Sequence, residues 1–142
     1  MTTWLLWALF SALFAAITAI LAKVGVAGVG SNLATAVRTS VVVVFTWLIA
    51  YATGEASGWQ LRSLAGRSWL FLFLSGLATG LSWLCYFHAL KVGPVSRVAP
   101  IDKLSVVLVI VFGAVFLRER ITGHTLAGGL LIAAGAVVIA LQ

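Results

Sequence analysis

Long apolar runs make up most of this chain, and they constrain its fold more strongly than any other feature. They cover residues 4–22, 33–53, 68–90, 96–117 and 124–141. About 20 apolar residues allow a helix to cross the ~30 Å hydrocarbon core of a bilayer. Backbone amides in hydrocarbon must bond within their own segment, and these runs are longer than barrel strands. The sequence therefore predicts an all-α polytopic membrane protein, with five transmembrane helices in one membrane domain over residues 1–142.

Composition excludes a nucleic-acid partner and a separate soluble domain. The chain is 63% apolar and 8% charged, whereas soluble domains carry about 25% charged residues. The net charge of +6 comes from basic residues that stand mostly singly at the ends of apolar runs. A nucleic-acid interface needs Lys and Arg clustered on one surface. The expected surroundings are therefore the lipid bilayer.

No residue pattern indicates catalysis, a metal or a cofactor. The single cysteine, Cys85, lies inside an apolar run, and His88 and His124 are far apart in the sequence. The sequence has no constellation of a catalytic nucleophile or of paired carboxylates, and it has no GxxxxGK[ST] loop. We therefore expect no enzyme activity, and we expect any transport to be driven by gradients.

The distribution of basic residues leaves the orientation of the chain nearly balanced. Five spans put the two termini on opposite sides of the membrane. The side with the N-terminus receives Arg62, Arg67, Arg118 and Arg120, and the other side receives Lys23, Lys91 and Arg97. Arg38 adds to the second side if it is counted as flanking. Because the Lys and Arg bias of short loops sets orientation, the slight bias favours a cytoplasmic N-terminus, and insertion in both orientations is also compatible with it.

Three charged residues, Arg38, Asp102 and Lys103, lie inside the apolar runs. Such residues cost about 2.5–3.5 kcal/mol at the centre of a span and usually face a cavity or a partner. Arg38 is five residues beyond Leu33 and Asp102 is six beyond Ser96, which places both about 8–9 Å inside the same leaflet. We predict that they can pair. Adjacent helical residues point about 100° apart, so Lys103 is expected to face away from Asp102.

These charges have two possible roles. They form either a solute or proton site, to which His88, Tyr86 and Trp83 on the third run would contribute, or a structural ion pair between two helices. Pro100 lies near the start of the fourth run. It either interrupts that helix, as at transporter binding sites, or is harmless in the first turns.

Small residues predict close helix packing. Gly76 and Gly80 are spaced four apart on the third run, and Gly128 and Gly129 begin a thin face on the fifth. Small residues let helix backbones approach closely in lipid, although glycine is also common in membrane helices. The segment between the second and third runs, residues 55–67, suits either an interfacial segment or a plain loop.

Several stretches carry a more specific signal. They are YFHALKVGPVSRVAPIDKLSVV (Tyr86–Val107), FLRERIT (Phe116–Thr122), GGLLIAAGAVVIAL (Gly128–Leu141), SALFAAITAILAKVG (Ser11–Gly25) and SNLATAVRTSVVV (Ser31–Val43). Together they resemble the EamA-type five-helix unit of the drug/metabolite transporter superfamily, over nearly the whole chain. In that family a basic residue often stands at the place of His88, and a polar or acidic residue near Pro94.

The resemblance implies a multi-pass protein of the inner membrane that exports small metabolites. Longer members of the family have ten spans, built from two such units in inverted orientation, and this chain supplies one. It is therefore expected to be half of an inverted-repeat transporter and to act as an antiparallel homodimer, with Arg38, Asp102 and Lys103 as pocket residues. The alternative is a non-transporting membrane subunit or scaffold that associates through its glycine-rich faces. The substrate and coupling ion stay open.

Overall fold

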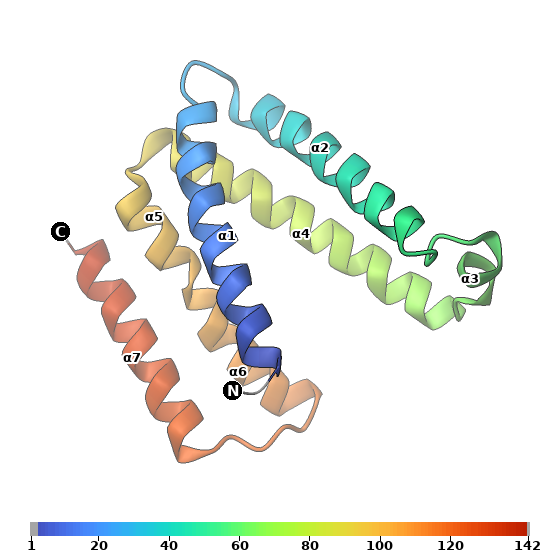
Figure 1. Cartoon of the computed structure of the whole chain (residues 1–142). Helices are drawn as coiled ribbons and strands as arrows, with labels where there is room; N and C mark the ends of the chain where they lie inside the picture. The colour runs from blue at the N-terminus through green and yellow to red at the C-terminus, as the bar shows by residue number, and fades with distance from the viewer. Residues whose placement is uncertain (1–2, 142) are drawn as a thin grey trace. The chain divides into compact units, whose positions relative to one another are not determined.

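The structure is a computed structural model that describes residues 3–141, apart from the side chains of residues 60 and 61. Figure 1 shows a chain of helices joined by short connections. The helices are α1 (Thr3–Gly25), α2 (Ser31–Ala52), α3 (Gly58–Ser63), α4 (Gly66–Val92), α5 (Val95–Asp102), α6 (Leu104–Phe116) and α7 (Gly123–Ala140).

The predicted all-α architecture with five membrane-spanning helices is confirmed. The helices α1, α2, α4 and α7 are each long and apolar enough to cross a membrane, and α5 with α6 forms the remaining span. The short helix α3 forms inside the segment predicted as either an interfacial segment or a loop, and its Trp59 is 82% exposed. The spans differ from the predicted runs by a few residues at their ends, because helical hydrogen bonding continues into the polar flanks.

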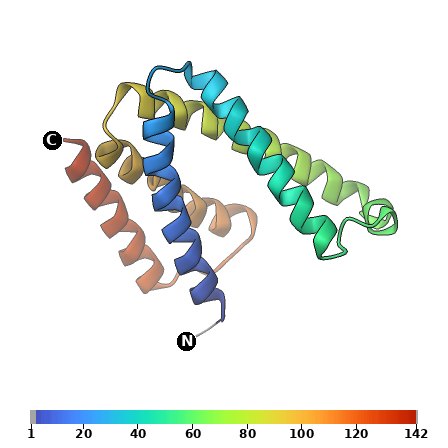
Figure 2. The ribbon, with the colours of Figure 1, turned by 45° about the horizontal axis from the view of Figure 1, so that its top comes forward.

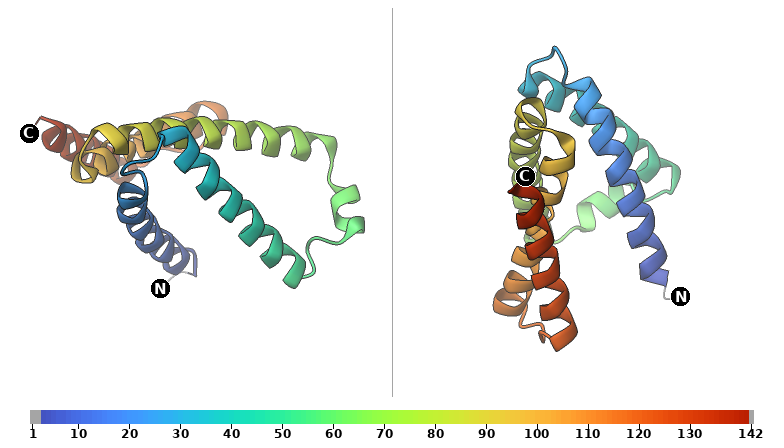
Figure 3. Two further views of the ribbon diagram at one scale, coloured as in Figure 1. Left: turned by 90° about the horizontal axis from the view of Figure 1, so that it is seen from above. Right: turned by 90° about the vertical axis from the view of Figure 1, so that its left-hand side faces the viewer.

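The chain divides into two compact units, which are described separately. Unit 2 comprises residues 22–91, and unit 1 comprises residues 3–21 together with residues 92–141. In unit 2, α2 and α4 form a hairpin whose far end carries α3. The two helices lie close together near the start of α2 and splay apart toward α3 (Figure 3, left).

The buried residues of unit 2 gather where α2 begins and α4 ends. Val26 and Leu90 are nearly inaccessible, at 2% and 0% exposure, and Phe87 and Thr35 are also buried. Gly28 has a φ of +77°, which lets the chain turn sharply between α1 and α2. Apolar burial is therefore concentrated at this end of the hairpin.

Unit 1 is built around α7, which packs against α5 and α6 (Figures 1 and 2). The helix begins at Thr122, whose hydroxyl accepts a hydrogen bond from the Thr125 amide at 3.2 Å. A Cβ at Gly129 would lie 3.1 Å from Cδ1 of Ile110 on α6, so α6 and α7 approach closely there. A Cβ at Gly128, Gly76 or Gly80 would meet no atom within 4 Å, and packing through those three glycines stays a prediction.

Most of the apolar surface of the spans faces outward. Only 6–11% of the residues in the most apolar stretch of each span are buried inside the chain. Large side chains such as Trp7 and Leu131 are more than 70% exposed. Such a surface is compatible with hydrocarbon rather than water as the solvent.

Candidate functional site

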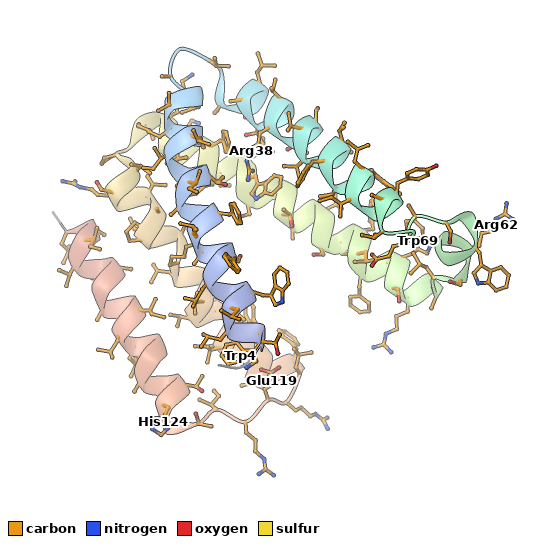
Figure 4. All side chains as sticks on the ribbon, viewed as in Figure 1. Trp4, Arg38, Arg62, Trp69, Glu119 and His124 are labelled. Carbon is orange, nitrogen blue, oxygen red and sulfur yellow. The ribbon has the colours of Figure 1, made fainter. Side chains whose placement is uncertain are left out.

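The charged residue in α2, Arg38, rests on aromatic rings of α4. Its guanidinium carbon lies 4.1 Å from the ring centroid of Trp83 and 5.6 Å from that of Phe87. Figure 4 shows the Arg38 side chain beside α4. A guanidinium over an indole face is attracted by the ring quadrupole, and more strongly where water is excluded. The aromatic rings therefore solvate this cation inside the apolar segment.

One hydrogen bond joins the end of α1 to the end of α4, and another closes within the first turns of α2. Lys23, at the end of α1, donates a hydrogen bond from Nζ to the Leu90 carbonyl at 2.6 Å. This bond places a cation at the C-terminal end of α4, where carbonyls lack helical partners. On α2, the buried Thr35 returns its hydroxyl to the Ser31 carbonyl at 2.9 Å and needs no other partner. Arg38, Trp83 and Phe87, called the Arg38 cluster below, therefore lie near the end of the hairpin where α2 begins and α4 ends.

The residues predicted on α4 divide into two groups. Trp83 contacts Arg38, and Tyr86 is half-buried with its ring edge-on to Phe87, the centroids 6.4 Å apart. His88 is exposed. The sequence analysis missed Phe87, which lies beside Arg38, and Lys23, which bonds the Leu90 carbonyl. The positions of Trp83, Phe87 and Leu90, at i, i+4 and i+7, are the signal that could have found Phe87.

The fourth span is interrupted at Lys103, between α5 and α6. Lys103 has φ −70° and ψ −8°, and its amide donates to the Pro100 carbonyl at 3.1 Å. The Val106 amide donates to the Lys103 carbonyl at 3.0 Å. Both bonds span three residues, which tightens the backbone into a turn. Pro100 has no N–H, so it cannot bond the Ser96 carbonyl one turn earlier.

Asp102 and Lys103 form an ion pair at this interruption. Nζ of Lys103 lies 3.4 Å from Oδ2 of Asp102, with the side chains 57% and 38% exposed, respectively. That adjacent helical residues point about 100° apart stays a prediction for the start of the two side chains. The long lysine stem can bend back, which brings the ammonium to the carboxylate.

The predicted pairing of Arg38 with Asp102 would join the two units and stays a prediction. Each residue lies seven positions beyond the start of its helix, Ser31 for Arg38 and Val95 for Asp102. That spacing places each about 10 Å along its own helix axis. Within residues 3–141, no three His, Cys, Asp or Glu side chains gather in a group that could hold a metal ion.

Comparison with known proteins gives two matches. The model of the EamA-like transporter family matches residues 2–141. A protein of Sinorhizobium sp. named "Uncharacterized transporter in cobO 3'region" is 53% identical over 139 residues, covering 97% of this chain and 96% of that protein. No solved structure matches the chain significantly.

Proposed function

Because the chain belongs to the EamA-like transporter family, we propose that it is a secondary transporter that exports small metabolites across the inner membrane as an antiparallel homodimer. The chain is a multi-pass membrane protein of a transporter family, and its relative is named as a transporter. The direction, the driving force and the assembly belong to the proposal.

The observation that carries the proposal is the ion pair at the interruption of the fourth span. Discontinuous helices near charged groups are typical of solute and ion sites in secondary transporters. Asp102 and Lys103 stand directly at the break, 3.4 Å apart, with the Asp102 side chain 38% exposed. A structural clasp between two helices would pair residues from different helices, whereas these are neighbours in sequence.

The pair supports proton coupling as the mechanism. When Asp102 takes up a proton from one side of the membrane, its charge is lost and the ion pair with Lys103 is broken. Lys103 can then hold an anionic group of the solute, so that proton and solute cross in the same direction. Release of both to the other side restores the pair, and the outward gradient of the solute drives export. Each step conserves the proton, and the rocking of the two halves gives it access to one side at a time.

The antiparallel homodimer follows from the number of spans and the charge balance. One copy supplies five spans, and longer relatives are expected to combine two such units in inverted orientation. The basic residues of the short loops number four on one side and three on the other, so the bias that sets orientation is weak. Two opposed copies would place one charged cluster near each face of the membrane.

Transport by reconstituted protein tests the proposal. Vesicles containing the purified chain are loaded with a panel of radiolabelled amphoteric and anionic metabolites, and efflux is followed with and without a pH gradient. We expect gradient-dependent efflux that Asp102→Asn abolishes, because an amide cannot carry the proton. Glu55→Gln, an acidic residue in the α2–α3 connection, is the matched control. Efflux unchanged in Asp102→Asn overturns the coupling role, and no efflux of any solute overturns transport.

A further inference from the structure

The guanidinium of Arg38 is held by its face on Trp83, and the half-buried Tyr86 also interacts with it electrostatically. The Trp83 ring covers one face at 4.1 Å, and Phe87 stands 5.6 Å away. The N–H donors of a guanidinium lie in its plane and point outward from its edge. We infer that this edge binds the carboxylate of a transported solute, a monocarboxylate with an apolar body. The inference deepens the proposed function and rests on it.

Unit 2 itself has no acidic residue close to Arg38 along the chain. Glu55 is the only acidic residue in residues 22–91, and it follows the end of α2 at Ala52. Arg38 lies 14 residues before Ala52, which is about 21 Å along the helix axis. In unit 1, Asp102 has the Lys103 ammonium as its partner at 3.4 Å. A carboxylate for Arg38 is therefore best supplied by the solute.

The chemistry of the cluster selects the class of solute. A guanidinium fork matches the two oxygens of a carboxylate, and stacking on the indole fixes the orientation of the fork before the ligand arrives. One cation neutralises one negative charge, whereas a second charge on the ligand would remain uncompensated in the apolar segment. The half-buried indole of Trp83 offers an apolar surface to the rest of the ligand, whereas Phe87 is buried beneath the cluster. A small aromatic or aliphatic monocarboxylate satisfies all three conditions.

A lipid phosphate offers similar chemistry and is the competing source. Arg38 lies seven residues inside α2, about 10 Å below the helix start, whereas lipid phosphates lie outside the hydrocarbon. A transported solute has to pass through that depth, whereas a lipid phosphate stays at the membrane surface. We therefore assign the site to a solute, and the experiment below separates the two sources.

Equilibrium binding of radiolabelled benzoate to the purified, delipidated full-length protein in a non-ionic detergent tests the inference. Benzamide, its neutral isostere, is the competitor that should not displace it. We expect Arg38→Gln to weaken benzoate binding at least about tenfold, since a charge-assisted hydrogen-bonded contact is lost. Arg38→Lys keeps the charge but loses the fork, and Trp83→Leu keeps an apolar side chain but loses the π face, so each should weaken binding about threefold or more.

Arg62→Gln removes the same charge from the exposed helix α3 of the same unit, and it should bind benzoate like the unaltered protein. Size-exclusion profiles matching the unaltered protein show that each variant is folded. Binding unaffected by Arg38→Lys and Arg38→Gln overturns the inference. A phospholipid that co-purifies with the protein, is lost in Arg38→Gln and leaves no benzoate binding also overturns it, as does the absence of benzoate binding.

Failure of the inference and failure of the proposed function are distinguishable. If vesicles export neutral or cationic metabolites while benzoate does not bind, transport stands and the carboxylate site is wrong. If benzoate binds in an Arg38-dependent way but no solute moves in any gradient, the site stands and the transport function is wrong.

Discussion

At the residue scale, the cations of unit 2 that lie nearest the hydrocarbon are satisfied without carboxylates. Lys23 donates to the Leu90 carbonyl, and Arg38 lies over Trp83. An unpaired charge in hydrocarbon is costly, but carbonyl dipoles and aromatic faces can replace part of the lost hydration. The Lys23 bond joins the end of α1 to the end of α4, and the Arg38 contact joins α2 to α4. Both depend on one side chain, so each can be tested by a single substitution.

Replacement of Lys23 by methionine should destabilise unit 2. Methionine keeps the apolar stem but cannot donate to the Leu90 carbonyl, and loss of a hydrogen bond from a charged donor costs about 1.5–3 kcal/mol. We expect a fall of at least about 1 kcal/mol in the free energy of unfolding in mixed micelles. Lys91→Met, an exposed lysine at the same end of α4, is the control. Equal stability of Lys23→Met and the unaltered protein would show that the 2.6 Å bond contributes nothing.

At the element scale, two helices depart from the regular pattern for different reasons. The fourth span contains Pro100, which cannot bond the Ser96 carbonyl, and it turns at Lys103, where two backbone bonds span three residues. The fifth span stays regular but buries a face that includes Gly129 and Ala136. Its close approach to α6 depends on the missing side chain at Gly129, where a Cβ would lie 3.1 Å from Ile110. The backbone of the fourth span sets its departure from a regular helix, whereas packing against α6 sets the position of the fifth span.

Substitution of Pro100 by alanine should make the fourth span more regular and slow transport. Alanine restores an N–H to bond the Ser96 carbonyl and raises the free energy of unfolding by about 1 kcal/mol or more. Amide hydrogen exchange around Lys103 should slow, and efflux from vesicles should fall. Pro94→Ala, at the residue before α5, is the control. Faster efflux in Pro100→Ala would contradict a functional interruption.

Substitution of Gly129 by leucine should separate α6 from α7. The added side chain would meet Cδ1 of Ile110, and overpacking of this kind typically costs about 1–3 kcal/mol. The adjacent Gly128→Leu is the matched control, because a Cβ there meets no atom within 4 Å. Denaturation in mixed micelles should show a lower midpoint for Gly129→Leu alone, partly restored by adding Ile110→Ala. A larger loss in Gly128→Leu would instead place that residue at an interface between copies.

At the scale of the whole molecule, two compact units share one chain, and little of the apolar surface is buried within it. The unit boundaries fall near the ends of α1 and α4 rather than in a loop between separate bundles. Because at most 11% of the most apolar stretch of any span is buried, lipid or a second copy must cover the rest. The basic residues are divided almost evenly between the two sides of the membrane, and this leaves the orientation of that second copy open.

Single cysteines should report both orientations if the antiparallel dimer forms. Cys85 is replaced by serine, and one cysteine is placed at Thr2 or at Gln142, which both lie outside the residues that the structure describes. With an impermeant thiol reagent on intact cells, we expect each of the two variants to be partly labelled. Full labelling of one terminus and none of the other means a single orientation, and rules out the antiparallel homodimer.

The sequence alone determined the fold class, the number of spans and the family. Length and apolarity suffice for this, because hydrocarbon forces every backbone amide to bond within its own helix. The sequence also identified Arg38, Asp102, Lys103 and Pro100 as unusual, since charges and proline stand out in apolar runs.

Only the tertiary structure decided what these residues contact. Arg38 lies on Trp83, 45 positions away in sequence, and Lys23 bonds Leu90, 67 positions away. Such contacts depend on how α2 and α4 pack, and helix periodicity does not encode that packing. The ion pair of Asp102 and Lys103 forms because the long lysine stem bends back to the carboxylate, which the angle of about 100° between adjacent helical residues does not show.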